Sequence, residues 1–153
     1  MRIDARLKEL NIVLPTPPAP VASYVPYVVS GNQVFISGQV TLTPDGLKYV
    51  GTVGKELTLE DGKAAARLCA LNVLAQAKAA CGGNLDRVKR VVKVTAFVNS
   101  VPGFAQQPEV ANGASDLFVE VFGDAGRHAR SAVGAGSLPR NVAVEVDAVI
   151  EIA

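Results

Sequence analysis

Residues 142–152 read Val-Ala-Val-Glu-Val-Asp-Ala-Val-Ile-Glu-Ile, and along this stretch apolar side chains stand at every second position. Such a period of two is typical of a β-strand that buries one of its faces. The even-numbered positions would form the buried face, because they carry only valine, alanine and isoleucine. The opposite face would carry Glu145, Asp147 and Glu151. The stretch therefore predicts a sheet with acidic side chains on the side away from the core.

Two upstream segments have the spacing of helices that lie on a sheet. Thr58 can cap the first, and Gly82-Gly83 would end it. Pro108 suits the first turn of the second, and Gly123 would end that one. The inward stripe of the first helix is expected at Ala64, Leu68, Leu71 and Ala75. That of the second is expected at Val110, Ala114, Leu117 and Val121.

The remaining strands are expected on both sides of the first helix. Residues 25–30 and 33–37 flank Gly31-Asn32, which suits a two-residue turn. Residues 47–50 form a short strand after a turn, and the valine-rich segment 87–99 forms a long one. The order of strands, helix, strand, helix and strands predicts an α+β fold, in which one mixed sheet carries two helices on one face.

The N-terminal segment is expected to differ in character from the rest. Residues 3–10 could form a short helix, whereas Pro15, Pro17, Pro18 and Pro20 exclude regular structure and predict an extended arm. Residues 1–20 would thus be a helix followed by a proline-rich arm. The whole chain of 153 residues has the length of a single domain.

Composition argues against several classes of function. The chain is 49% hydrophobic, and 15 basic against 14 acidic residues leave a net charge of +1. A net charge this small gives no strong electrostatic attraction to nucleic acid or to a membrane surface. Neither a signal peptide nor a long apolar run is recognisable, which predicts a cytoplasmic protein.

Metal and thiol chemistry are also not expected. His128 is the only histidine, and the sequence contains no cluster with the spacing of metal ligands. Cys69 and Cys81 fall in one predicted helix about 18 Å apart, so they cannot form a disulfide with each other. Both are expected to be buried thiols. No metal or organic cofactor is expected.

The expected strand 87–99 suggests that this chain does not act alone. Val92, Val94, Ala96 and Val98 alternate with Val91, Thr95 and Phe97, so both faces of this strand are partly apolar. If helices cover only one face, the other face is expected to pack against a second copy of the chain. The pattern therefore favours an oligomer.

Arg130 and Glu145 are the best candidates for chemistry. A guanidinium presents a planar fork of donors that matches a carboxylate, and a glutamate on a strand can hold or deprotonate a water molecule. Arg130 is expected just before a strand, and Glu145 on the following one. From spacing alone, an Arg130–Glu145 salt bridge between adjacent strands explains the two residues slightly better than a site does.

A family resemblance changes this weighting. Ala129-Arg130-Ser131-Ala132-Val133, Leu138-Pro139 and Val144-Glu145-Val146-Asp147-Ala148 resemble the C-terminal signature of the reactive-intermediate deaminase (Rid, or YjgF-like) family, formerly labelled L-PSP endoribonucleases. Residues 31–39, which end in Ser-Gly-Gln, and residues 93–99 are similar to two strands of that family. The likeness covers roughly residues 21–152.

The resemblance implies a chorismate-mutase-like fold and a homotrimer with pockets between subunits. It implies hydrolysis of enamines and imines, such as 2-aminoacrylate or 2-iminopropanoate, to 2-keto acids and ammonia. On this sequence, Arg130 would bind the substrate carboxylate, and Glu145 would position the attacking water. The pocket would be lined by Tyr24, Ser37, Gly38 and Asn112.

This sequence departs from the family pattern in several places. The family's Gly-Pro-Tyr is Ala-Ser-Tyr at positions 22–24, and the cysteine that some members carry after Arg-Ser is Ala132. The loop 105–111 and the N-terminal arm are longer than in the archetype. These features resemble a distinct branch with a longer chain.

Two alternatives to a deaminase remain. One is a trimer that binds small carboxylic acids without turning them over, which needs Arg130 but not Glu145. The other is an endoribonuclease, which is the weaker alternative because His128 is the only histidine and no basic, aromatic groove is recognisable.

Overall fold

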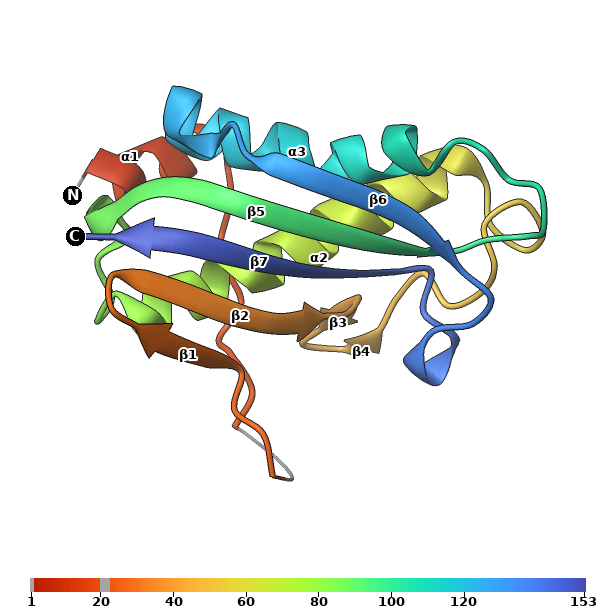
Figure 1. The fold of residues 1–153 in the computed structure, drawn as a ribbon, viewed down its shortest axis with the longest axis horizontal. Coiled ribbons are helices and arrows are strands. Elements are labelled where there is room, and N and C mark those ends of the chain that lie inside the picture. Colours follow the sequence, from red (N-terminus) through yellow and green to blue (C-terminus); the bar gives the residue numbers. More distant parts are fainter. Residues whose placement is uncertain (1, 20–22) are drawn as a thin grey trace.

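A five-stranded sheet organises the chain in the computed structural model, which describes residues 2–19 and 23–153 (Figure 1). The sheet has the strand order β1-β2-β7-β5-β6, and only β5 and β6 run parallel. The five strands are β1 (Tyr27–Ser30), β2 (Gln33–Gln39), β5 (Val88–Asn99), β6 (Ala129–Ala135) and β7 (Val144–Ile152). A separate two-stranded ladder consists of β3 (Leu42–Thr43) and β4 (Gly46–Leu47).

Helices cover one face of this sheet. They are α1 (Arg2–Glu9), α2 (Leu59–Ala80) and α3 (Gln107–Phe122), with short 3-10 turns η1 (Leu85–Arg87), η2 (Gly123–Gly126) and η3 (Pro139–Asn141). In Figure 1, α2 and α3 lie side by side behind the strands, and α1 lies at one end of α3. The expected α+β arrangement, a mixed sheet with two helices on one face, is confirmed. None of the helices in the described residues is long and apolar enough to cross a membrane.

The termini of α2 follow the local sequence signals. The backbone N–H of Asp61 donates to the hydroxyl of Thr58 (3.1 Å), and the backbone N–H of Thr58 donates to the carboxylate of Asp61 (2.9 Å). This reciprocal pair forms a capping box, which satisfies two donors that the first turn leaves unpaired. At the other end, Gly82 and Gly83 adopt positive φ angles of 65° and 94°, as the sequence predicts.

The inward stripe expected for α2 is wrong in detail. Ala64, Leu68 and Leu71 are only half-buried. The buried residues are Gly62, Ala65, Ala66, Cys69, Ala70, Val73, Leu74, Ala75, Gln76 and Ala77. The reason is that α2 packs against α3 as well as against the sheet, so its buried surface is wider than one stripe. Small side chains line this surface and allow close approach on two sides. For α3, the expected inward residues are all buried.

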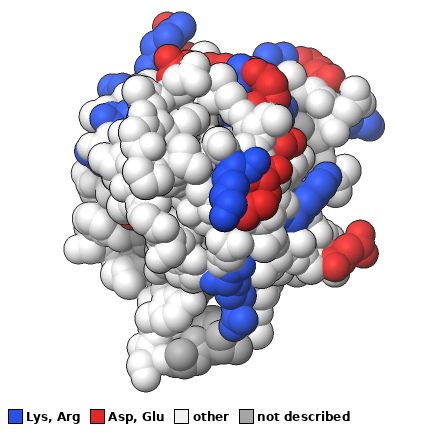
Figure 2. Space-filling view, turned by 90° about the vertical axis from the view of Figure 1, so that its right-hand side faces the viewer, with Lys and Arg blue, Asp and Glu red and all other residues white. Residues whose placement is uncertain are grey.

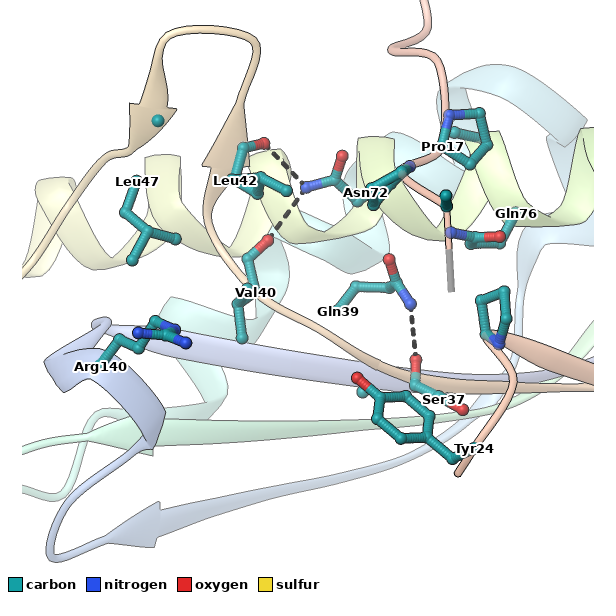
Figure 3. Close-up of a pocket in the computed structure, with 16 residues that line it drawn as sticks. Pro17, Tyr24, Ser37, Gln39, Val40, Leu42, Leu47, Asn72, Gln76 and Arg140 are labelled. Atoms are coloured by element: carbon teal, nitrogen blue, oxygen red, sulfur yellow. Dashed lines mark hydrogen bonds between the residues drawn. The ribbon is translucent and has the colours of Figure 1, made fainter. Parts of the chain in front are cut away.

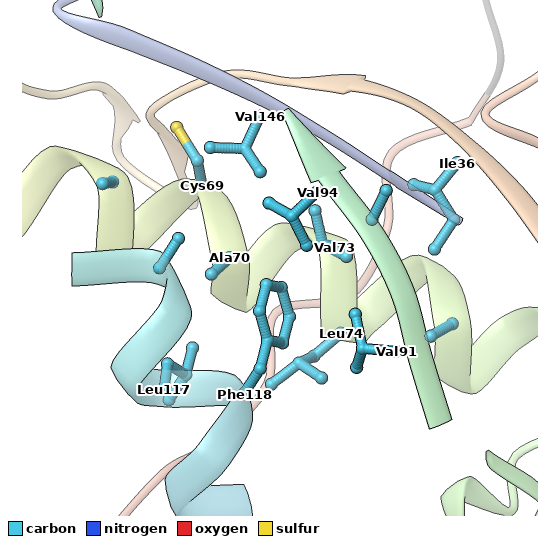
Figure 4. Close-up of a cluster of buried hydrophobic side chains, with 14 of the residues drawn as sticks. Ile36, Cys69, Ala70, Val73, Leu74, Val91, Val94, Leu117, Phe118 and Val146 are labelled. Atoms are coloured by element: carbon cyan, nitrogen blue, oxygen red, sulfur yellow. The ribbon is translucent and has the colours of Figure 1, made fainter. Parts of the chain in front are cut away.

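The core fills the space between the two long helices and the sheet (Figure 4). Phe118 of α3 is fully buried, and its ring lies among side chains from α2 and β5. Burial of a side chain of this size stabilises the fold by about 1.5–3 kcal/mol. The even-numbered residues of β7 face this core, which confirms the alternation of residues 144–152. Cys69 and Cys81 are buried and unpaired, as expected.

The N-terminal segment forms the expected helix and extended arm. Asp86 accepts hydrogen bonds from the backbone N–H groups of Arg2 (2.9 Å) and Ile3 (2.8 Å), so a residue distant in the sequence caps α1. Residues 12–19 have no regular structure, and the arm crosses from α1 to the β1 side of the sheet (Figure 1). Met1 and residues 20–22, which include Pro20 of the expected arm and Ala22 of the Ala-Ser-Tyr segment, lie outside the described residues.

Among residues 2–19 and 23–153, no helix covers the other face of the sheet, called here the open face. Its apolar side chains include Phe35 and Val133, which are 48% and 43% exposed. The register places Phe35 opposite Val149, and Val133 opposite Phe97, which is itself opposite Glu145. The open face therefore carries apolar side chains around a few carboxylates. This agrees with the sequence pattern of β5, which predicts that both faces of that strand are partly apolar.

Candidate functional site

Arg130 lies within β6 and points to the helical side of the sheet. It is paired in register with Val94 of β5, whose side chain is buried under the helices. Its Nη1 donates to Oδ1 of Asn112 (2.8 Å) and to Oγ of Ser115 (3.1 Å), both on α3. Two of the predicted site residues, Arg130 and Asn112, are thus in direct contact. The contacts occupy Nη1, and the rest of the guanidinium makes no hydrogen bond or ion pair within residues 2–19 and 23–153.

His128 extends this contact network. Its Nδ1 lies 2.6 Å from the carbonyl oxygen of Gly126, and its Nε2 lies 2.9 Å from the hydroxyl of Ser115. A carbonyl can only accept, so Nδ1 carries the proton, and Nε2 of the neutral ring accepts the hydroxyl proton. The oxygen of Ser115 is then oriented to accept from Arg130. Burial lowers the pKa of His128. The hydrogen bond to Gly126 partly opposes this and nearby Arg130 adds to it, so the net shift favours the neutral ring.

Glu145 lies on the open face, on the opposite side of the sheet from Arg130. It is paired with Phe97 of β5. A Cβ atom added to Gly38 would lie only 2.8 Å from the Glu145 side chain, so Gly38 leaves room for this carboxylate. Burial, with a smaller contribution from Asp147, raises the pKa of Glu145. A carboxyl group with a raised pKa is better suited to accept and return a proton near neutral pH.

The expectation that Arg130 and Glu145 lie on adjacent strands is wrong. Arg130 is inside a strand rather than before one, and β5 separates β6 from β7. The physical reason is the crossover through α3, which places β6 parallel to β5 on its outer side. β7 then pairs with the inner side of β5. Within one chain the two residues cannot form a salt bridge or contact one small substrate.

The other three predicted site residues meet at a cavity. Tyr24, Ser37 and Gly38 all line a cavity of about 550 Å³ between the N-terminal arm, the end of β2 and α2 (Figure 3). The Ser37 hydroxyl donates to the carbonyl of Val25 (2.9 Å). Tyr24 is 64% exposed, and Figure 3 shows its ring over the strands at the edge of the cavity. A Cβ atom on Gly38 would meet the Glu145 side chain, so Glu145 lies next to the wall of this cavity at Gly38.

The sequence predictions missed several side chains in both groups. Ser115 and His128 hold Arg130, while Asn72, Gln76 and Arg140 line the cavity. Helical spacing places Ser115 one turn after Asn112, and strand alternation places His128 on the same side as Arg130. These two spacings in the sequence could therefore have identified Ser115 and His128 as neighbours of Arg130. Nothing in the local sequence brings Gln76 and Arg140 to one cavity.

Two further kinds of site would bear on function: a metal site among the described residues, and a strongly charged surface on the one face that Figure 2 shows. No group of three or more His, Cys, Asp or Glu side chains that could hold a metal ion occurs within the described residues. At the end of the molecule that carries β3, β4 and η3, basic and acidic side chains are interspersed among large uncharged areas (Figure 2). That face has no continuous basic patch of the kind that binds nucleic acid.

Comparison with known proteins identifies the family to which this fold and these site residues point. A family model described as "YjgF/chorismate mutase-like, putative endoribonuclease" matches residues 4–152. Protein TCP17 of Trypanosoma cruzi is 53% identical over 152 residues, which covers 99% of this chain and 94% of that protein. A 2-iminobutanoate/2-iminopropanoate deaminase of Dermatophagoides farinae is 27% identical over 142 residues, covering 92% and 94%.

Solved structures show the same fold with two degrees of similarity. The structure of Atu1372 from Agrobacterium tumefaciens, a protein of unknown function, has a TM-score of 0.92 and 47% identity over 99% of this chain and 94% of that one. The YjgF gene product of Escherichia coli has a TM-score of 0.62 and 29% identity, over 89% and 93%. The fold is thus shared with both, and it follows the first over nearly its whole length.

Proposed function

Because the chain belongs to the YjgF/chorismate mutase-like family, we propose that it hydrolyses reactive 2-imino acids to 2-keto acids and ammonia. One observation carries the proposal. Arg130 is held through a single nitrogen by Asn112 and Ser115, which leaves donors of its guanidinium to bind a carboxylate. The name of the mite relative, at 27% identity, supports the choice of substrate.

The reaction would need both Arg130, which binds the carboxylate of the substrate, and Glu145, which transfers protons. Water adds to the C=N carbon, and its proton passes to Glu145 as the new C–O bond forms. Glu145 then returns this proton to nitrogen, which gives a carbinolamine. In a second transfer Glu145 takes the proton of the new hydroxyl and passes it to nitrogen, so that the C–N bond breaks and ammonia leaves while C=O forms. The step involves no change of oxidation state. The raised pKa of Glu145 suits this exchange of protons.

The site would be completed between two copies of the chain. Arg130 and Glu145 lie on opposite sides of the sheet, so one copy cannot bring both to a small substrate. A neighbouring copy packed on the open face could supply the missing half. We therefore propose a homotrimer, in which Arg130 and Asn112 of one copy face Glu145, Gly38 and Tyr24 of the next.

The test is release of ammonia or keto acid from 2-iminopropanoate that an amino-acid oxidase generates in situ. Arg130→Lys should reduce kcat/KM about tenfold to a hundredfold, because an ammonium cannot reproduce a two-bond contact with a carboxylate. Arg127→Lys is the matched control, since Arg127 is exposed and pairs with Asp124 away from Asn112. Its activity should equal that of the wild type.

The alternatives give different results in the same experiment. Full turnover by Arg130→Lys would refute the carboxylate contact. A protein that only binds carboxylates would release no ammonia, and Glu145→Gln would leave its binding unchanged. Cleavage of RNA in the presence of a chelator, lost in His128→Ala, would favour the endoribonuclease.

A further inference from the structure

Ser115 and His128 have the relative geometry of a nucleophile and its general base. Ser115 lies on α3 and His128 directly before β6, and these two elements pack side by side (Figure 1). The Ser115 hydroxyl lies 2.9 Å from Nε2 of His128. Since Nδ1 carries the ring proton, Nε2 can take the proton of the hydroxyl. The proposed hydrolysis of imines gives neither residue a role in proton transfer.

The ring of His128 is held in one orientation. Its Nδ1 donates to the carbonyl of Gly126 at 2.6 Å, and the ring packs edge to face against Phe118, with the centroids 5.7 Å apart. Phe118 is fully buried, so it is fixed by the core. The carbonyl of Gly126 thus fixes the tautomer, as a carboxylate does in a catalytic triad. The net lowering of the His128 pKa, chiefly by burial, keeps the ring available as a base at neutral pH.

Arg130 supplies donors beside the attacking oxygen. Its Nη1 donates to Oγ of Ser115 (3.1 Å), which favours negative charge on that oxygen. When Oγ adds to a carbonyl carbon, the former carbonyl oxygen becomes an oxyanion two bonds away from Oγ. This oxyanion forms within reach of the same guanidinium, whose other nitrogens make no hydrogen bond within residues 2–19 and 23–153. A cation at this point stabilises the intermediate.

The surroundings of Ser115 indicate the size of the acyl group. Ser115 and His128 are half-buried, whereas Asn112, one turn away, is exposed, so solvent reaches the pair. Ser115 lines neither the cavity of about 550 Å³ at Tyr24 nor the cavity of about 310 Å³ at Gly134. An open site of this kind does not enclose a long acyl chain. We propose that Ser115 and His128 form a nucleophile–base pair that hydrolyses short-chain carboxylic esters.

The reaction has two steps and changes no oxidation state. Oγ of Ser115 attacks the ester carbonyl carbon while its proton passes to Nε2 of His128. The C–O bond to the alcohol then breaks, and the alcohol leaves with that proton, which gives an acyl-serine. Water attacks the acyl-serine and gives a proton to Nε2, and the carboxylic acid is released as Oγ regains the proton.

Ester hydrolysis and covalent labelling test this assignment with the full chain. The substrate is 4-nitrophenyl acetate. The label is diisopropyl fluorophosphate, which loses fluoride when it phosphorylates an activated serine. Wild-type protein should hydrolyse the ester and carry the label on Ser115, located by peptide mass spectrometry.

Two variants separate a catalytic pair from a structural one. Ser115→Ala removes the nucleophile and suits a helix, and it should reduce kcat/KM for the ester about a hundredfold or more. His128→Gln keeps an acceptor for the Ser115 hydroxyl but removes the base, so it should also reduce kcat/KM about a hundredfold. Ser137→Ala is the matched control, since Ser137 is exposed and lies beyond the end of β6. It should keep the wild-type rate and the label on Ser115.

Three outcomes would overturn the proposal. They are a wild type without label on Ser115, a Ser115→Ala variant as active on the ester as the wild type, and a fully active His128→Gln variant. The last would mean that His128 only orients Ser115 toward Arg130. The proposal does not use Glu145 and does not rest on imine hydrolysis. Absence of ammonia release would refute the deaminase alone, and absence of the serine label would refute the esterase alone.

Discussion

Three carboxyl groups of this protein have shifted pKa values, and the direction of each shift follows from its surroundings. Glu145 and Asp147 are two positions apart on β7, so both side chains lie on the open face. Burial raises the pKa of each, while Thr95 and Lys93 partly oppose the rise for Asp147. Asp86 is the opposite case, because two backbone N–H groups of α1 lower its pKa.

These directions predict how stability depends on pH. A raised pKa means that folded Glu145 binds more protons than the unfolded chain above about pH 4.5. The free energy of unfolding therefore falls as pH rises through that window. Glu145→Gln removes this term, so the variant should gain stability relative to the wild type as pH rises to 7. Urea unfolding followed by circular dichroism from about pH 4 to 7 measures it.

Asp86→Asn provides a comparison of opposite sign. A lowered pKa contributes stability at higher pH that is lost as pH falls. Asp86→Asn should therefore lose stability relative to the wild type as pH rises. The difference in the free energy of unfolding between Glu145→Gln and the wild type is the deciding quantity. If this difference is independent of pH, or changes in the direction expected for Asp86→Asn, the environment assigned to Glu145 is wrong.

Among the elements, the contact between α2 and α3 depends most on small residues. Gly113 of α3 lies against the backbone of α2, and a Cβ atom there would overlap the carbonyl of Lys63. Gly62 of α2 lies against Val110 of α3 in the same contact. The two helices thus approach through glycines, which allows the side chains of both to reach the sheet.

Gly113→Ala should consequently destabilise the protein. In an exposed helix this change usually stabilises by about 1 kcal/mol. Here it should cost roughly 2 kcal/mol or more, because the helices must move apart in a packed core. Urea denaturation would measure the change. Gly136→Ala is the control, since no atom lies within 4 Å of its added Cβ and its φ is not in the left-handed region. Equal stability of both variants would contradict the close helix contact.

For the whole molecule, the open face is the feature that one chain leaves unexplained. Phe35 and Val28 are adjacent across β1 and β2, and both are about half exposed. Contiguous apolar surface of this kind commonly marks an interface between proteins. This apolar surface lies on the same face of the sheet as Glu145. Arg130 of the same chain lies on the other side of the sheet, so in the proposed site a second copy supplies the arginine.

Phe35→Glu should therefore dissociate the proposed trimer, because a charge would be buried without a partner. Sedimentation equilibrium should give three chain masses for the wild type and one for the variant. Val13→Glu is the control, since Val13 is 92% exposed on the arm, and it should remain trimeric. A monomeric wild type, or a trimeric Phe35→Glu variant, would refute the trimer.

Much of the candidate site could be recognised from its residues, but not its arrangement. Asn112 does contact Arg130, and Tyr24, Ser37 and Gly38 do line one cavity. Their proximity follows from strands and helices whose local patterns are clear. The separation of Arg130 from Glu145 could not be predicted in the same way, because it depends on which strand pairs with which.

The sequence by itself determined the elements and their faces. The alternation of residues 144–152, the capping box at Thr58 and the turn at Gly31 depend on interactions within a few residues. Only the tertiary structure decided the strand order, the wider buried face of α2 and the placement of Gln76 and Arg140 around one cavity. These depend on contacts between residues far apart in the chain. Many pairings satisfy the same local pattern, and the packing of the whole core selects one.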